Sequence, residues 1–454
     1  MSQTTTHVSG FTKLIDAENE RFRETHPRSY DLATQTAKSL LNGVPMSWMT
    51  HWATPFPIFM DRASGARLWD VDSNEYVDFC LGDTGAMAGH SPRATVEAMN
   101  RQAASGITGM LATADAIAVG EELGRRFGLP KWQIVMTATD ANRYVLRLAR
   151  HITGRPKVLV FNWCYHGTVD ETLAVLDDDG RIARRPGVVG PTQAPSETTR
   201  VVEFNDVAAL ERELAHGDVA CVITEPALTN IGIIPPEPRF HEALRELTRA
   251  AGALLIIDET HTMCAGPGGM TAELALAPDL LVVGKSIGGG MPVAAYGMTE
   301  EVARAASPAV EEPDQNISGI GGTLSGNALA VAAVRATLAN SLRAEDYART
   351  IPLAARWTEG VRSVIDEMGL PWSVTQLGCR AEYWPATGRR TAADAAKMSD
   401  EEATTYLHLH AINRNVLLAP FHNMALMCPA TSEADVDLHT NVFREGLRNV
   451  AAVR

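Results

Sequence analysis

The chain contains little cysteine and no long apolar run, and each shortage excludes a class of protein. Six of its 454 residues are cysteine, and no two form a CxxC pair. A disulfide framework or a zinc site is therefore not expected, and buried thiols are. Apolar runs such as 253–257 are far shorter than a bilayer span, and residues 1–10 lack the apolar segment of a signal peptide. We expect no membrane partner, no metal and a cytoplasmic location.

Positive charge is also scarce. The sequence has 40 Lys and Arg against 54 Asp and Glu, which gives a net charge of −14, and no strongly basic block occurs. Binding to nucleic acid normally needs a basic face, so no nucleic-acid partner is expected. Only six of the cationic residues are lysine, so a lysine with a catalytic role must be one of these: Lys13, Lys38, Lys131, Lys157, Lys285 and Lys397.

The middle of the chain alternates between short apolar segments and helical patterns. Five apolar, β-branched segments predict strands: 134–136, 157–161, 219–224, 253–257 and 280–283. Helical patterns such as 140–151 and 240–251 lie between several of them. This alternation predicts an α/β protein with a largely parallel sheet, whose ligands bind at the carboxyl ends of the strands. After about residue 340 the pattern changes to α+β, and we place a domain boundary there.

One lysine follows a predicted strand directly, in the sequence Gly284-Lys285-Ser286. A phosphate-binding P-loop would need a glycine where Asp279 stands, so that interpretation is rejected. A lysine at the end of a buried strand is partly desolvated, which favours its neutral, nucleophilic form and suits a Schiff base. By itself the motif fits a Schiff-base lysine and a solvated loop lysine equally well.

The strand that precedes Lys285 in the chain favours the first interpretation. It ends in Asp258, and a buried carboxylate is costly unless it is paired. The protonated pyridine ring of pyridoxal phosphate (PLP) is such a partner. Asp258 and Lys285 lie 285 − 258 = 27 residues apart on successive predicted strands, so both can meet one ring. Thr137-Ala138-Thr139 begins a helix and could hold the phosphate or simply cap the helix, and Tyr165 could stack on the ring or pack ordinarily.

Together these motifs resemble those of the class III PLP-dependent aminotransferases, from about residue 35 to the end of the chain. The resemblance rests on six ordered motifs: Thr139-Asp140-Ala141-Asn142, Tyr165-His166-Gly167, Glu225-Pro226, Asp258-Glu259, Gly284-Lys285 and Gly322-Thr323-Leu324-Ser325-Gly326-Asn327. It implies a fold-type I α/β enzyme with a large PLP-binding domain (66–340) and a small α+β domain built from both ends of the chain (1–65 and 341–454). It also implies a homodimer with shared active sites.

The same resemblance assigns a role to each matching residue. Lys285 corresponds to the lysine that forms the Schiff base and shuttles protons, and Asp258 to the partner of the pyridine nitrogen. Thr323 corresponds to a threonine that reaches the phosphate from the neighbouring subunit. The remaining cofactor-binding residues that it implies are Thr137, Ala138, Thr139, Tyr165, His166, Glu225 and Thr260. The family usually has Ser-Gly-Thr-Glu where this chain has Thr137-Ala138-Thr139-Asp140, so Ala138 replaces a glycine, and Thr260 replaces a valine.

The reaction is expected to be transamination of a primary amine or a β- or ω-amino acid to a keto acid such as pyruvate or 2-oxoglutarate. Glutamate-1-semialdehyde aminomutases, a similar subgroup, carry a glutamate where this chain has Met424 and a polar, arginine-containing stretch where it has 45–49. Such a mutase, another PLP reaction such as racemisation or decarboxylation, and a non-catalytic protein of the same fold are the alternatives.

Substrate recognition is expected to involve aromatic side chains and one cation. Aryl β-amino acid aminotransferases use arginines where this chain has Trp48 and Phe421 or His422, which indicates a roomy aromatic pocket. Arg380 is the candidate cation for the acceptor carboxylate, although a salt bridge with Glu382 explains it equally well. The substrate-binding candidates are therefore Trp48, His51, Trp52, Arg380, Phe421 and His422.

Overall fold

The chain divides into two compact units. A computed structural model describes residues 10–190, 193–311, 319–388 and 391–453. The terminal unit comprises Met1–Asp83, Ala348–Gly388 and Met398–Arg454, and the central unit comprises Thr84–Tyr347 and Arg389–Lys397. The main boundaries thus fall at residues 83 and 347, whereas the sequence placed them at 65 and 340. Each unit is described by itself.

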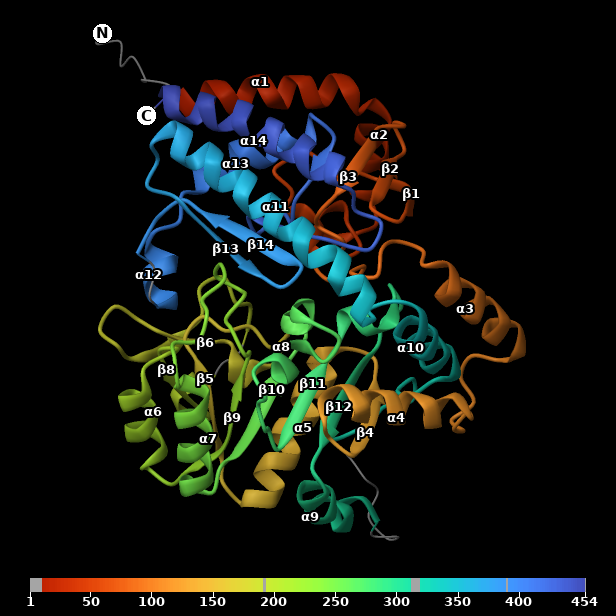
Figure 1. The fold of residues 1–454 in the computed structure, drawn as a ribbon, viewed down its shortest axis with the longest axis vertical. Helices are drawn as coiled ribbons and strands as arrows, with labels where there is room; N and C mark the ends of the chain where they lie inside the picture. Colours follow the sequence, from red (N-terminus) through yellow and green to blue (C-terminus); the bar gives the residue numbers. More distant parts are fainter. Residues whose placement is uncertain (1–9, 191–192, 312–318, 389–390, 454) are drawn as a thin grey trace. The chain divides into compact units, whose positions relative to one another are not determined.

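A seven-stranded sheet forms the centre of the central unit (Figure 1), in the order β4-β12-β11-β10-β9-β5-β8. Its strands are β4 (Lys131–Val135), β5 (Lys157–Phe161), β8 (Thr199–Val202), β9 (Val219–Thr224), β10 (Leu254–Asp258), β11 (Leu280–Val283) and β12 (Ala294–Met298). Neighbouring strands are parallel except at β12, which is antiparallel to both β11 and β4. The carboxyl ends of β5, β9, β10 and β11 therefore share one edge.

Helices cover this sheet because its strands are apolar on both faces. Every residue of β9 and of β11 is buried. Helix α5 (Ala138–Thr153) packs on β9, β11 and β12, and α7 (Phe240–Ala251) packs on β10. The α/β class with a mostly parallel sheet is confirmed. The other elements of this unit are α3 (Arg93–Ser105), α4 (Asp115–Phe127), β6 (Ala174–Leu176), β7 (Ile182–Arg184), α6 (Val207–Leu214), α8 (Gly269–Glu273), α9 (Glu300–Glu311), α10 (Ala328–Asn340) and α12 (Ala392–Lys397).

The terminal unit contains two small sheets, and the first of them joins the two ends of the chain. The first has the order β1-β2-β3-β15 and the second the order β13-β14-β16. Their strands are β1 (Met60–Ser64), β2 (Arg67–Asp70), β3 (Glu75–Asp78), β13 (Ser373–Leu377), β14 (Arg380–Trp384), β15 (Val416–Leu417) and β16 (Met424–Leu426). The helices are α1 (Gly10–Thr25), α2 (Pro27–Thr36), α11 (Ala344–Met368), which starts in the central unit, α13 (Glu401–Ile412) and α14 (Glu433–Val453).

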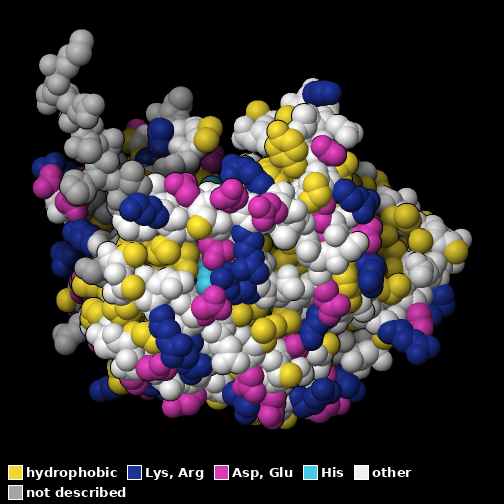
Figure 2. All heavy atoms as spheres, turned by 90° about the horizontal axis from the view of Figure 1, so that it is seen from above, with side chains coloured by type: hydrophobic (Ala, Val, Ile, Leu, Met, Phe, Trp, Pro, Cys, Tyr) yellow, Lys and Arg dark blue, Asp and Glu magenta, His cyan; other side chains and the backbone are white. Residues whose placement is uncertain are grey.

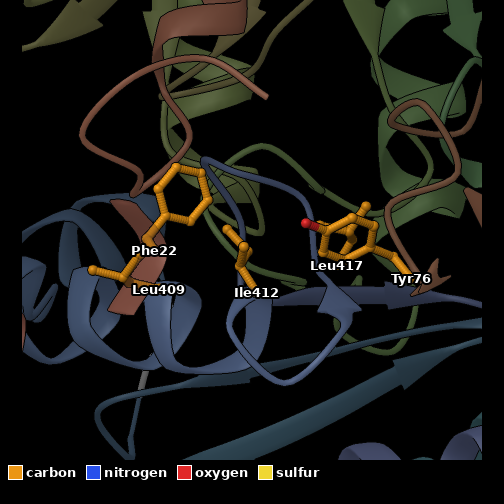
Figure 3. Packing of buried hydrophobic residues seen from close by; sticks show 5 residues of the cluster. All are labelled: Phe22, Tyr76, Leu409, Ile412 and Leu417. Carbon is orange, nitrogen blue, oxygen red and sulfur yellow. The ribbon is translucent and has the colours of Figure 1, made fainter. Parts of the chain in front are cut away.

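A buried apolar cluster holds these distant segments together (Figure 3). Its members are Phe22, Tyr76, Leu409, Ile412 and Leu417, which come from α1, β3, α13 and β15. Since β3 pairs in parallel with β15 through Val77 and Val416, residues more than 300 positions apart form one core. The cluster explains why residues 66–83 belong with the termini rather than with the central sheet.

The surface carries mixed charge. On the face drawn in Figure 2, acidic and basic side chains are interspersed. All six cysteine side chains are buried. No helix among the described residues combines the length and the apolar character that crossing a bilayer demands.

Candidate active site

Asp258 ends strand β10 and is held ionised by its neighbours. Its Oδ2 accepts a hydrogen bond from Asn142 Nδ2 at 2.9 Å and lies 2.9 Å from His166 Nδ1, while its Oδ1 accepts one from the Thr260 N–H at 3.0 Å. Burial raises the pKa of Asp258, but the interactions with His166, Thr260 and Asn142 outweigh burial and lower the pKa to about 2. The carboxylate is therefore negative at neutral pH, the state that can pair with a protonated pyridine nitrogen.

Lys285 follows the neighbouring strand. Asp258 lies opposite Val282 in the parallel ladder between β10 and β11, so Lys285 comes three residues beyond that level. Its φ of +50° is a left-handed conformation that non-glycine residues adopt at a cost. Its Nζ lies 2.9 Å from His261 Nε2. A Cβ at the preceding Gly284 would lie 3.0 Å from the Ala138 Cβ, so the strand end passes close to the start of α5.

The start of α5 meets the loop that follows β5. Thr137 caps the helix, since its hydroxyl accepts a hydrogen bond from the Asp140 N–H at 3.2 Å. The Thr139 hydroxyl accepts another from the Thr168 N–H at 3.2 Å. Gly167 has a φ of +81°, and a Cβ there would lie 2.2 Å from the Thr139 Oγ1. This contact brings the Tyr165-His166-Gly167 motif to a helix N-terminus, where an anion is favoured.

The donor set at this edge of the sheet fits PLP. Ser286, next to Lys285, has a fully buried hydroxyl that meets no hydrogen-bond partner among the described residues. A buried hydroxyl in that state is costly, and an oxygen of a bound group would satisfy it. Glu225, which follows β9, is buried and accepts a hydrogen bond from the Thr229 hydroxyl. A lysine, an ionised carboxylate and a helix N-terminus thus converge where a phosphorylated pyridine ring needs them.

Thr323 lies in a turn. It is exposed, and the turn is closed by a hydrogen bond from the Ser325 N–H to the Gly322 carbonyl at 2.9 Å. An exposed position within one chain is the one expected of a residue that reaches a neighbouring subunit.

The aromatic substrate-binding candidates lie in the terminal unit. The rings of Trp48 and Phe421 are 5.4 Å apart in an edge-to-face arrangement, and both side chains are partly exposed. The structure thus brings these two residues together. His51, three residues after Trp48, is exposed, whereas Trp52 is half-buried and packs against the apolar cluster of Figure 3. That packing gives Trp52 a structural role.

Arg380 and His422 share one buried carboxylate. Arg380 is completely buried, and its Nη2 lies 3.0 Å from Glu382 Oε2, while His422 Nδ1 lies 3.4 Å from Glu382 Oε1. Burial raises the pKa of Glu382, but His422 and Arg380 outweigh burial and lower it. From the sequence, an ion pair with Glu382 and substrate binding explained Arg380 equally well. The ion pair is present, and it neutralises the charge of the guanidinium.

Three residues of the central unit were not singled out for the site from the sequence. Asn142, which holds Asp258, did carry a signal, because it lies in the first motif of the resemblance and one helical turn after Thr139. His261 carried none, since its contact with Lys285 depends on side-chain direction. Arg185, whose guanidinium lies 5.8 Å from the centre of the Tyr165 ring, follows a hairpin that the sequence did not predict.

Known proteins share this fold. The family described as aminotransferase class-III matches residues 48–356. A glutamate-1-semialdehyde-aminomutase from Pseudomonas aeruginosa PAO1 superposes with a TM-score of 0.95 at 47% identity and covers 97% of this chain and 98% of its own. A lysine-to-alanine variant of that protein has been solved in complex with PMP. An omega-transaminase from Sphaerobacter thermophilus has a TM-score of 0.86 at 28% identity, with coverage of 94% and 99%.

Sequence relatives give the same family. A glutamate-1-semialdehyde 2,1-aminomutase of Sorangium cellulosum is 35% identical over 398 residues, which are 86% of this chain and 89% of its own. Fold and site together define a PLP-dependent enzyme of fold type I. The chain belongs to the class III aminotransferases.

Proposed function

We propose that this protein moves an amino group within a small carboxylate-bearing substrate, in a reaction of the glutamate-1-semialdehyde 2,1-aminomutase type. The relative at 35% identity and the structure at 47% identity both carry that name, and this similarity carries the proposal. Such a reaction returns the amino group to the carbon skeleton that it left, so it consumes no second substrate. The sequence had ranked this reaction second, behind transamination.

The side chains of the central unit divide the chemistry between them. Lys285 would hold the cofactor through its Nζ and would move a proton at the substrate carbon that bears nitrogen. Asp258, an ionised carboxylate held by Asn142 and His166, would pair with the ring nitrogen. The helix N-terminus at Thr137 favours the phosphate. When bound, PLP supplies the electron sink that stabilises negative charge at the substrate carbon.

A homodimer completes this proposal. Three exposed apolar side chains follow α3 in the loop before α4: Ile107, Met110 and Leu111. The loop adjoins the Thr323 segment, because the Ala328 N–H donates to the Ile107 carbonyl at 3.0 Å, and Leu324 beside it is also exposed. Grouped exposed apolar side chains are typical of an interface. We infer that this surface meets a second copy, which receives Thr323 at its phosphate site.

Transamination is the second candidate. Trp48 and the buried Met424 stand at positions where the mutases carry polar groups, and Phe421 packs edge-to-face on Trp48, so this region is aromatic and apolar. The likeness to an omega-transaminase supports the same reaction.

One experiment separates the two candidates. The loaded enzyme is given glutamate-1-semialdehyde without an acceptor and, separately, 1-phenylethylamine or β-phenylalanine with pyruvate or 2-oxoglutarate. The mutase proposal predicts an isomer of unchanged mass in the first arm. Turnover confined to the second arm would replace it with transamination.

A further inference from the structure

One arginine of the central unit has an unusual environment. Arg185 follows β7, is half-buried, and donates from Nη1 to the Cys164 carbonyl at 2.8 Å. Its guanidinium lies 5.4 Å from the centre of the Trp163 ring and 5.8 Å from that of Tyr165. Two aromatic rings thus border a guanidinium that donates few of its five possible hydrogen bonds to the protein.

Comparable arginines in the same unit use their donors more fully. Arg155 donates to two backbone carbonyls, those of Val219 and Ala251. Three other half-buried arginines have a carboxylate within 2.7 Å: Arg150, Arg200 and Arg245. Arg185 has no ion pair with any residue in the described part of the chain.

Partial burial of the Arg185 guanidinium costs free energy, because it removes water from a charged group. Burial lowers the pKa of Arg185 below its usual value, and the acidic groups of Cys164, Tyr165 and Glu225 oppose that effect only in part. A partly desolvated cation gains most from an anion that accepts two parallel hydrogen bonds.

The position of Arg185 links it to the cofactor-binding residues. Tyr165 is followed by His166, whose ring lies 2.9 Å from the Asp258 carboxylate. Trp163, which begins this segment, has a φ of +61°. That conformation is strained for a bulky residue, and such strain clusters at functional sites.

We propose that Arg185 binds a carboxylate group of the substrate between Trp163 and Tyr165. The inference rests on the proposed function and deepens it, because it names the residue that selects carboxylate-bearing substrates. It also gives the role that the sequence had offered to Arg380, which is already paired with Glu382. The phosphate of the cofactor is the other anion that could meet this guanidinium, and the test below separates the two.

The test compares Arg185→Gln and Arg185→Lys with the wild-type enzyme. Loss of a charge-assisted pair predicts that Arg185→Gln raises KM for the carboxylate-bearing substrate about 10- to 100-fold, with kcat unchanged. Arg185→Lys keeps the charge without the fork and is expected to recover part of the loss. Arg181→Gln on the same hairpin, where Arg181 is exposed and pairs with Asp179 at 3.0 Å, is the matched control and should leave both values unchanged.

A binding measurement tests the proposal without requiring turnover. Calorimetry with glutarate on the loaded enzyme should give a Kd about 10- to 100-fold weaker in Arg185→Gln, with unaltered PLP content. If glutarate binding depends on Arg185 while no amino-group transfer is found, the proposed function fails and the carboxylate site stands. An unchanged KM for the carboxylate-bearing substrate, loss of PLP with normal glutarate binding, or no glutarate binding by the wild type would each overturn the proposal.

Discussion

At the scale of single residues, the account depends on a buried carboxylate kept negative. Asp258 accepts three hydrogen-bonding contacts at 2.9–3.0 Å, and its pKa lies near 2 despite burial. Replacing it with asparagine keeps the shape but removes the charge. We expect Asp258→Asn to lower kcat/KM about 10²- to 10³-fold, because an electrostatic group aimed at the reacting system is lost.

The matched control for this prediction is Asp218→Asn. Asp218 precedes β9 at the opposite end of the strands and pairs with Arg200 at 2.7 Å. Steady-state kinetics of the two PLP-loaded variants measure the effect. Equal kcat/KM in both would contradict a role of Asp258 in the reaction.

Residue positions at strand ends could be predicted from the sequence, and side-chain partners could not. Asp258 and Lys285 follow apolar runs that form strands. A parallel sheet brings the carboxyl ends of such strands together, independently of side-chain conformation. The sequence left the partner of Arg380 open between Glu382 and a substrate, because the burial of Arg380 depends on tertiary packing. The environment of Arg185 depends on the β6–β7 hairpin and on the backbone of Trp163, neither of which leaves a periodic signal.

At the scale of secondary-structure elements, one contact fixes the loop after β5 on the start of α5. We expect Gly167→Ala to weaken PLP binding and to lower the free energy of unfolding by more than the ~1–2 kcal/mol that a left-handed alanine alone costs. The extra loss comes from the Thr139 hydroxyl, which would lie 2.2 Å from the new Cβ.

Gly180→Ala isolates the backbone contribution to that prediction. Gly180 has a φ of +74°, close to the +81° of Gly167, but a Cβ there would meet nothing within 4 Å. Denaturant unfolding and PLP titration of both variants give the comparison. Identical losses in both would contradict the proposed contact between loop and helix.

A second link ties α1 to α13 within the terminal unit. Glu18 is hydrogen-bonded to His410 at 3.0 Å, Asn413 at 2.7 Å and Arg414 at 2.9 Å. Burial raises the pKa of Glu18, but these partners outweigh burial and lower it from 4.5 to about 2. A lowered pKa in the folded state means that the ionised form stabilises the fold at neutral pH and that this stabilisation disappears in acid.

We therefore expect Glu18→Gln to lower the free energy of unfolding by about 1–3 kcal/mol at pH 7. The difference from the wild type should be constant above about pH 5 and should shrink as the pH falls from 4.5 towards 2. Urea unfolding at several pH values measures it. A difference that grows in acid would contradict the assignment.

Elements with a strong local pattern could be predicted, and those fixed by distant partners could not. The five apolar runs of the central sheet are strands, within a few residues of the expected bounds. β12 (Ala294–Met298) was missed because its sequence, Ala-Ala-Tyr-Gly-Met, is neither β-branched nor alternating. The sequence placed β2 and β3 in the large domain, whereas they belong to the terminal unit, because β3 pairs with β15 from the other end of the chain.

At the scale of the whole molecule, the account requires a second copy. Leu111 is 81% exposed and lies in the loop whose Ile107 carbonyl accepts a hydrogen bond from Ala328, so Leu111→Asp should shift the protein from dimer to monomer and weaken PLP binding. Val189→Asp places the same charge at another exposed apolar residue of the central unit and is the control. Sedimentation velocity measures both, and a dimer unaffected by Leu111→Asp would move the interface elsewhere.

The central claim is that one lysine of six carries the cofactor. Reducing the PLP-loaded protein with borohydride makes that bond permanent, and mass spectrometry of a digest then locates the phosphopyridoxyl group. The account predicts the added mass on the peptide that contains Lys285 and on no other. Its appearance on Lys13, Lys38, Lys131, Lys157 or Lys397, or on no lysine at all, would contradict the account.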